Sequence, residues 1–186
     1  MSQITRRAII QSFLKLLNQS PLDKITVRDI VDDCGVTRST FYYYFEDIYA
    51  LLEEVFRQET DKRLNSGKAY TSWEEGFLDT VSFALENRRA IFHVYHSLSR
   101  EQLEQYLYDI TGDLMDRIVR GLTADLPVQE EDVCMVVDLY KYALVGMILN
   151  WLQRGMKEDP TEKIRRLGKL LDGNIRAVLS KTVERR

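Results

Sequence analysis

The sequence predicts an all-α protein, with a three-helix N-terminal domain containing a helix-turn-helix and a larger helical domain after it. Apolar residues recur three and four positions apart, as on one face of an amphipathic helix, and no stretch alternates as strands do. Capping residues and glycines divide the chain into segments of helical length. Only three prolines occur in 186 residues, so few positions interrupt a helix.

Composition and charge describe a soluble globular protein that is not broadly basic. Hydrophobic residues make up 45% of the chain and charged residues 30%, and the formal net charge is −3. In residues 1–50, six Lys and Arg balance six Asp and Glu. Any affinity for a nucleic acid would therefore have to come from a local surface on which the fold places positive and negative charges on different faces.

The chain begins as an amphipathic helix and not as a signal peptide, which predicts a cytoplasmic protein. Its most apolar stretch, residues 133–152, is interrupted by two charged residues and an asparagine, which predicts a buried helix and no membrane partner. Cys34 and Cys134 lack the spacing of a metal site, so we expect two buried, reduced thiols. We expect no cofactor.

The first predicted helix covers residues 5–18 and ends before Pro21. It is expected to pack behind the helix-turn-helix pair. For Arg6 and Arg7, solvated surface charge is favoured over contact with phosphate. The apolar residues of this helix are Ile9, Phe13, Leu16 and Leu17.

Residues 26–45 form the predicted helix-turn-helix. Thr26 can accept a hydrogen bond from a free backbone N–H of the first turn, and Asp29 completes an approximate capping box. Gly35 can take the left-handed conformation that closes a helix. Thr37 then caps a second helix. Two capped helices joined by a short glycine-containing turn follow the helix-turn-helix plan.

The second of these helices has one apolar and one polar face. Phe41 and Phe45 lie four residues apart and anchor the helix to the core. An arginine can bind a guanine edge, and hydroxyls can reach bases or phosphates. An ordinary capped helical hairpin with an aromatic core is the alternative. The residues left for the polar face are Arg38, Ser39, Thr40, Tyr42 and Tyr43.

These residues resemble the DNA-binding region of the TetR/AcrR family of bacterial transcriptional regulators. The matching residues are 26–30, 35–45, Leu51 and Leu52, within the first third of the chain. The resemblance implies a DNA-binding domain in residues 1–46 and a ligand-sensing and dimerisation domain in 47–186. The DNA-binding residues it implies, together with the helix chemistry, are Thr26, Arg28, Thr37, Arg38, Ser39, Thr40, Tyr42, Tyr43 and Tyr44.

The sequence departs from the family at Ile48, where members usually carry a lysine that contacts phosphate. Here the run is Glu46-Asp47-Ile48. The acids suit a helix N-terminus through the helix dipole, but they do not attract DNA. We therefore expect weaker anchoring to the DNA backbone at this point than in a typical member.

The remaining elements follow from caps and breaks. We expect helices over residues 47–64, 72–86, 90–98, 99–122 and 130–154, with a loop at 65–72. Ser72 and Ser99 open capping boxes, and Asn87 can cap the short helix. After a break at Gly155 and a start at Pro160, one last helix runs to the C-terminus.

The last helix carries apolar residues at spacings of three, four, four and three, which is the seam of a partner helix. Packing within one chain is the alternative. The favoured interpretation, which the family resemblance also implies, is a homodimer joined by a four-helix bundle. Its two heads would then bind half-sites about 34–36 Å apart in a palindrome. The predicted interface comprises Ala143, Gly146, Ile164, Leu167, Leu171, Ile175 and Val178.

The middle helices are rich in aromatic residues, and an apolar pocket with a few polar groups is how small-molecule sites are built. Members of the family sense ligands in this region. For any single ring, simple filling of the core is the favoured alternative. A metal at His93 and His96 is disfavoured, because no Cys or carboxylate cluster accompanies them. The candidate ligand-binding residues are Trp73, Phe77, Phe92, Tyr95, His96, Tyr106 and Tyr140.

The sequence therefore predicts a ligand-responsive, sequence-specific regulator of transcription, and we expect a repressor. Its partners would be double-stranded DNA, a second copy of itself and an unknown small-molecule effector. No Gly-rich phosphate loop or nucleophile elbow is present, so an enzyme is not expected. The alternative is a helical sensor or coactivator module that acts through protein contacts.

Overall fold

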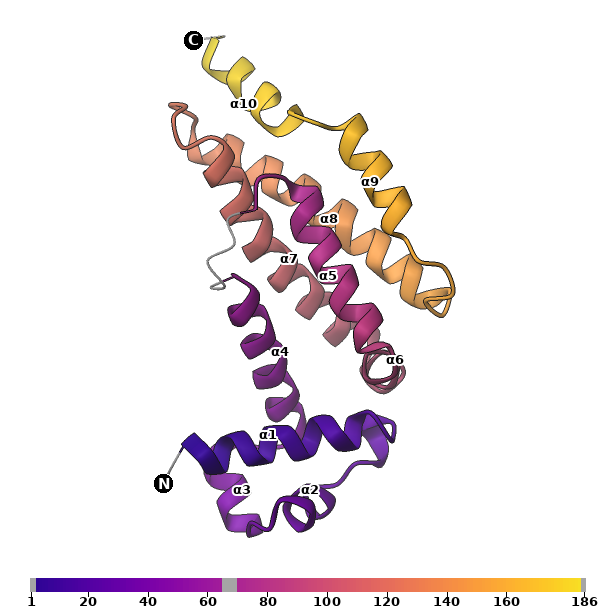
Figure 1. Cartoon of the computed structure of the whole chain (residues 1–186). Helices are drawn as coiled ribbons and strands as arrows, with labels where there is room; N and C mark the ends of the chain where they lie inside the picture. Colours follow the sequence, from indigo (N-terminus) through magenta and orange to yellow (C-terminus); the bar gives the residue numbers. More distant parts are fainter. Residues whose placement is uncertain (1–2, 65–69, 185–186) are drawn as a thin grey trace. The chain divides into compact units, whose positions relative to one another are not determined.

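The computed structural model describes residues 3–64 and 70–184, and every regular element within these ranges is helical (Figure 1). The predicted all-α class is therefore confirmed. The elements are α1 (Gln3–Leu17), the short 3₁₀ helix η1 (Leu22–Lys24), α2 (Val27–Cys34), α3 (Arg38–Tyr44), α4 (Ile48–Leu64), α5 (Trp73–Glu86), α6 (Arg88–Ser97), α7 (Arg100–Leu122), α8 (Glu130–Gln153), α9 (Thr161–Leu170) and α10 (Asn174–Glu184).

The described chain divides into two compact units. The first contains α1 to α4 together with Asn87–Leu98, which includes α6. The second contains α5 and α7 to α10. Packing units need not coincide with functional domains, so the predicted boundary between residues 46 and 47 stays a prediction.

The first unit is held together by an apolar core shared by α1, α2, α3, α4 and α6. The side chains of Ile9, Phe13, Ile30, Phe41 and Leu51 have no solvent-accessible surface. The buried Ser12 hydroxyl on α1 donates a hydrogen bond to the Ile30 carbonyl on α2 at 3.1 Å. This bond ties α1 to the helix before the turn, as expected for a helix that packs behind the pair.

The predicted caps of the helix-turn-helix are present. The Thr26 hydroxyl accepts from the Asp29 N–H, and the Asp29 carboxylate accepts from the Thr26 N–H at 2.8 Å. The hydrogen bond from the Thr26 hydroxyl to this carboxylate is the main reason that the pKa of Asp29 lies below its ordinary value. Gly35 ends α2 at φ 70°, and the Thr37 hydroxyl accepts from the Thr40 N–H.

Substituting Gly35 tests the turn. Its positive φ disfavours any side chain, although a Cβ there would meet no atom within 4 Å. We expect Gly35→Ala to lower the free energy of unfolding by about 1–2 kcal/mol. Gly121, in the last turn of α7, is equally open but helical, so Gly121→Ala should raise stability, by at most about 0.5–1 kcal/mol. Urea unfolding would measure the change in the free energy of unfolding of both variants. A change in the same direction in both would contradict the turn geometry.

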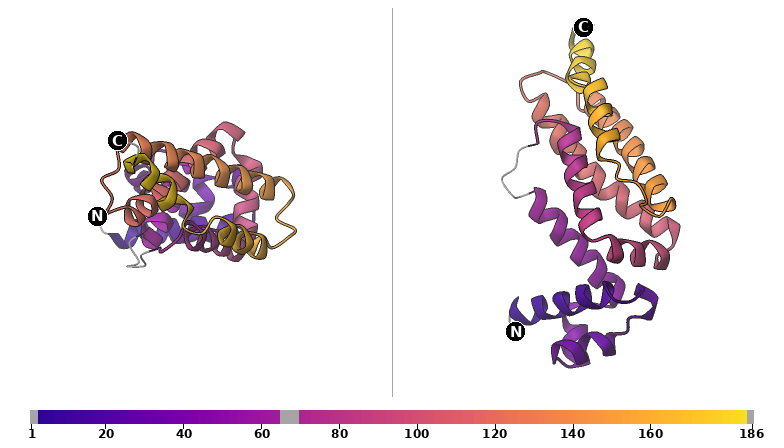
Figure 2. Two further views of the ribbon diagram at one scale, coloured as in Figure 1. Left: turned by 90° about the horizontal axis from the view of Figure 1, so that it is seen from above. Right: turned by 45° about the vertical axis from the view of Figure 1, so that its right-hand side comes forward.

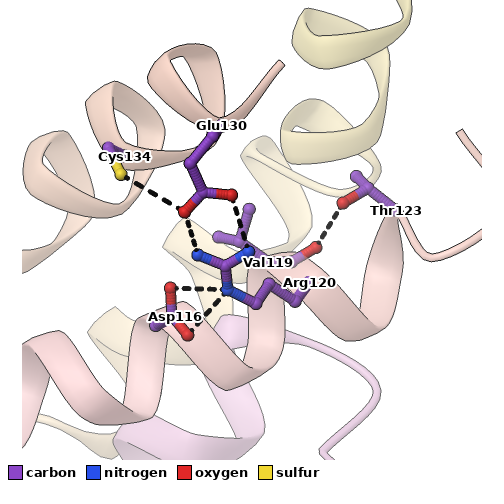
Figure 3. A network of polar contacts seen from close by, with 6 residues as sticks. All are labelled: Asp116, Val119, Arg120, Thr123, Glu130 and Cys134. Atoms are coloured by element: carbon purple, nitrogen blue, oxygen red, sulfur yellow. Dashed lines mark hydrogen bonds and ion pairs between the residues drawn. The ribbon is translucent and has the colours of Figure 1, made fainter. Parts of the chain in front are cut away.

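In the second unit, α7 and α8 form a long antiparallel hairpin, with α5 beside α7 and α9 beside α5 (Figure 2). At the loop end of the hairpin, the Arg120 guanidinium on α7 donates to Asp116 on the same helix and to Glu130 at the start of α8 (Figure 3). These bonds hold the pKa of Arg120 above and that of Glu130 below their ordinary values.

The prediction of one continuous last helix is wrong. The helix α9 ends at Leu170, and the chain turns through Gly173 at φ 66° before α10 begins. The apolar residues of the predicted seam are therefore divided between α9, the turn and α10. Ile164 and Ile175 are buried within their own chain, whereas Val178 is exposed.

Two smaller differences concern polar side chains. Cys134 is exposed on α8 and Cys34 is half-buried, so the prediction that both thiols are buried is wrong for Cys134. Asn87 precedes α6, but its side chain makes no capping hydrogen bond. Most of the predicted 65–72 loop lies outside the described residues. Among the helices that the structure describes, none combines the length and the apolar character that crossing a membrane requires.

Candidate nucleic-acid interface

The helix α3 presents two faces, as its sequence predicts. Phe41 and Phe45 are buried in the core of the first unit. Tyr42 and Tyr43 point the other way, with 57% and 65% of their surface exposed. Exposed tyrosine side chains can donate hydrogen bonds to phosphate oxygens of DNA.

The first turn of α3 is an exposed polar edge. Thr37, Arg38 and Ser39 are exposed, and Thr40 is half-buried. The Thr37 hydroxyl lies 2.8 Å from that of Ser39 and 2.9 Å from that of Thr40, which orders all three groups. Ordered hydroxyls beside an arginine can read base edges. We call residues Thr37, Arg38, Ser39, Thr40, Tyr42 and Tyr43 the α3 face.

Several charges of the first unit neutralise one another in ion pairs. Lys15 pairs with Asp33 at 2.5 Å, and this contact is the main reason that the pKa of Asp33 is lowered. Two further cations, Arg6 and Arg28, are also paired. Among the described residues, Arg38 has no ion pair, so its guanidinium charge is not neutralised by the protein.

The arginines of α1 and α2 differ in how firmly they are held. Arg6 lies 2.5 Å from Glu54 and also stacks over the Phe45 ring at 5.7 Å. It therefore connects α1 to α4, which agrees with a structural role over phosphate contact. Arg28 pairs with Asp32 at 3.4 Å, and both side chains are largely exposed. Such a pair is weak in water, so Arg28 can exchange Asp32 for DNA.

Thr26 and Tyr44, two of the nine predicted DNA-binding residues, also contribute to the fold. The Thr26 hydroxyl is held in the capping box by Asp29. Tyr44 is half-buried against the core and packs edge-on to Tyr43, with ring centroids 5.0 Å apart. Contact of all nine residues with DNA stays a prediction.

The start of α4 explains the departure at Ile48. The Asp47 carboxylate accepts a hydrogen bond from the Ala50 N–H at 2.8 Å and so caps the helix. The Ile48 side chain packs against the core of the first unit. This position therefore contributes to stability and offers no cation to a phosphate.

The predicted ligand-binding residues fall into two groups. On α5 and α8, the buried rings of Trp73, Phe77 and Tyr140 cluster, with Trp73 and Tyr140 centroids 5.9 Å apart. On α6, in the other unit, Phe92, Tyr95 and His96 form a second cluster. Tyr106 is half-buried on α7. Ligand binding by either cluster stays a prediction.

The two histidines of α6 have contacts other than metal. The His93 Nδ1 lies 2.7 Å from the Leu17 carbonyl oxygen at the end of α1. The His96 ring packs against Phe92 at 4.6 Å. Within residues 3–64 and 70–184, no group of three or more His, Cys, Asp or Glu is arranged to hold a metal ion.

A surface that the sequence analysis missed lies along α8. The apolar residues Met135, Leu139 and Tyr142 are exposed on the same side as Ala143 and Gly146. Their spacing of three, four and seven residues was visible, but α8 is apolar on most sides, so the sequence did not reveal which side faces outward. We call these five residues the α8 stripe.

Two family models match most of the chain. Residues 9–55 match the model described as bacterial regulatory proteins, tetR family. Residues 71–173 match the model described as transcriptional regulator C-terminal region. Both models describe regulators and not enzymes.

Individual proteins are similar at low identity. The HTH-type dhaKLM operon transcriptional activator DhaS of Lactococcus lactis subsp. lactis (strain IL1403) is 25% identical over 118 residues, covering 63% of this chain and 62% of DhaS. The uncharacterized HTH-type transcriptional regulator YxbF of Bacillus subtilis (strain 168) is 24% identical over 173 residues, covering 86% of this chain and 43% of YxbF. The chain thus spans less than two thirds of the length of either relative.

Solved structures share the fold. The dihydroxyacetone kinase operon activator DhaS superposes with a TM-score of 0.74 at 19% identity, covering 95% of this chain and 98% of that one. NalD, the secondary repressor of the MexAB-OprM multidrug efflux pump in Pseudomonas aeruginosa, gives a TM-score of 0.59 at 17% identity, covering 91% and 96%.

Proposed function

Because the chain belongs to the TetR family of bacterial regulatory proteins, we propose that it is a ligand-responsive regulator that binds a palindromic operator as a homodimer. That it is a TetR-type transcriptional regulator follows from both family models and from its relatives. The observation that carries the finer proposal is the α3 face, which stands outward while Phe41 and Phe45 hold the helix to the core.

The α3 face has the chemistry of a recognition helix. Arg38 supplies a guanidinium that has no ion pair within the described part of the chain and can bind the O6 and N7 atoms of a guanine. The neighbouring hydroxyls can bind bases or phosphates, and the two exposed tyrosines can bind the backbone on either side. A helix with this division enters the major groove with its N-terminal residues toward the bases.

The α8 stripe supports a homodimer. Leu139 is 66% exposed at the middle of an apolar row that ends in Ala143 and Gly146, and a Cβ at Gly146 would meet no atom within 4 Å. Exposed apolar rows mark association surfaces, and small residues permit the close approach of another helix. A two-fold dimer carries two α3 faces, one for each half-site of a palindrome.

Control by a ligand requires two conformations of the protein that bind the ligand with different affinities. We propose that α4 and α6 connect the ligand site to DNA binding. The helix α6 packs in the first unit, yet α5 and α7, which adjoin it in sequence, belong to the second. The contact of His93 with the Leu17 carbonyl connects α6 to α1, and Ser12 connects α1 to α2.

The proposed sign of regulation is repression. A repressor needs only the α3 face and the dimer, because occupying a promoter is sufficient. The similar proteins include one named an activator, DhaS, and one named a repressor, NalD. A reporter gene placed behind a selected operator would decide the sign, since expression should rise when the regulator gene is deleted.

Selection of bound fragments from a random DNA pool tests the proposed function. We expect a palindrome with half-sites about 34–36 Å apart, and retention that falls steeply as salt is raised, because phosphate contacts release counterions. No enrichment even at low salt would contradict DNA binding and favour a module that acts through protein contacts.

A further inference from the structure

A cavity lies in the second unit where α9 gives way to α10. The start of α5, the end of α7 and the turn between α9 and α10 line this half-open space of about 370 Å³. This volume falls in the range of small-molecule sites, which is roughly 300–1,000 Å³. The cavity thus lies at the break between α9 and α10, where the sequence predicted one continuous helix, and it is large enough for a small molecule.

Part of the cavity wall is apolar. Trp73 at the start of α5 and Ile175 at the start of α10 are buried side chains that line it, and Leu122 and Leu171 complete the apolar surface. Such walls can cover the body of a ligand and exclude water around a polar group.

A carboxylate is held at this surface. Glu74 packs so closely on α9 that a Cβ at Gly168 would collide with its carboxylate. The glycine thus makes room for the acid. Among the described residues, no hydrogen bond or ion pair reaches Glu74, so the carboxylate has no protein cation to neutralise it.

The Arg176 guanidinium, which lines the cavity, is already neutralised by a carboxylate. The Arg176 guanidinium binds both carboxylate oxygens of Asp125 at 2.6 Å and donates to the Leu122 carbonyl at 2.8 Å. This pairing lowers the pKa of Asp125 to about 2. Of the other charges that line the cavity, two are carboxylates, Glu74 and Asp172, and one is the ammonium of Lys169. The cavity therefore retains an excess of one negative charge.

We propose that this cavity binds a small organic cation, whose apolar body lies against Trp73 and Leu171 and whose charged group binds the Glu74 carboxylate. An amidinium or ammonium on a ring or short chain has this chemistry. Binding here does not require that the chain bind DNA, so failure of one proposal leaves the other standing.

Three probes of one shape and different charge test the site on the full chain. Benzamidine, benzamide and benzoate would each be titrated by calorimetry. We expect saturable binding of one benzamidine per chain, at least about tenfold tighter than the other two, because a hydrogen bond to a charged group contributes about 1.5–3 kcal/mol. Equal affinities, or no binding of benzamidine, would overturn the proposal.

Substitutions locate the site. Glu74→Gln should weaken benzamidine at least about tenfold and leave benzamide unchanged. Glu101→Gln is the matched control, because Glu101 is an exposed carboxylate in the first turn of α7 and does not line the cavity. An equal loss in the control, or none at Glu74, rejects the site.

A third variant is expected to bind benzamidine more tightly than the unchanged protein does. Lys169 is exposed at the rim of the cavity, so replacing it disturbs no packing. Lys169→Gln removes an ammonium that has no ion pair among the described residues and should tighten benzamidine by up to about fivefold, about 0.2–1 kcal/mol. Unchanged or weaker binding would show that the charge balance of the cavity does not select a cation.

Discussion

Replacing Phe41 with alanine should lower the free energy of unfolding by about 3–5 kcal/mol, the usual cost of deleting a buried ring. The Phe41 side chain has no exposed surface and packs 5.8 Å from the Phe45 ring. Because domains are stable by only about 5–15 kcal/mol, this loss should leave the first unit partly unfolded at growth temperature. Urea unfolding followed by circular dichroism would measure it.

The neighbouring tyrosine provides the control. Tyr42 follows Phe41 directly but is exposed, and its ring meets Phe41 only edge-on at 5.5 Å. Tyr42→Ala should therefore change stability by no more than about 0.5 kcal/mol. If both substitutions cost the same, the division of α3 into an inward and an outward face is wrong.

Replacing Leu139 with aspartate should convert the proposed dimer to monomers. Leu139 is 66% exposed in the middle of the α8 stripe, and a charge buried there without a partner costs several kcal/mol. A two-fold interface contains the change twice, so even about 2 kcal/mol per copy weakens association about a thousandfold. Sedimentation over a range of protein concentrations would measure the dissociation constant.

Leu170→Asp is the matched substitution outside the stripe. Leu170 is 73% exposed on α9, so the same chemical change there should leave the dimer intact. A dimer that persists with Leu139→Asp but separates with Leu170→Asp would move the interface to α9 and α10.

The sequence predicted best where local chemistry decides the structure. The capping box of Thr26 and Asp29, the left-handed Gly35 and the Thr37 cap are satisfied within a few residues, so they can be identified without tertiary information. The inward direction of Phe41 and Phe45 also follows from helical spacing alone. These features define the candidate DNA-binding surface, which is why it could be predicted.

Predictions from the sequence failed where tertiary packing or a single residue decides the structure. Apolar residues at spacings of three and four fit one long helix or two short ones, and the break depends on Gly173, whose left-handed conformation has no apolar signal. Cys134 lies on a helix that is apolar on most sides, so only its neighbours determine that it faces outward. The two aromatic clusters were likewise indistinguishable in sequence.

The most direct test of DNA recognition by α3 is the affinity of Arg38→Ala for the selected operator. Arg166→Ala, on the exposed side of α9, removes the same charge elsewhere and serves as the control. Loss of a guanine contact should cost about 1–3 kcal/mol and relax base preference at one position of each half-site. Unchanged affinity and unchanged preference in a folded Arg38→Ala protein would contradict recognition through this face.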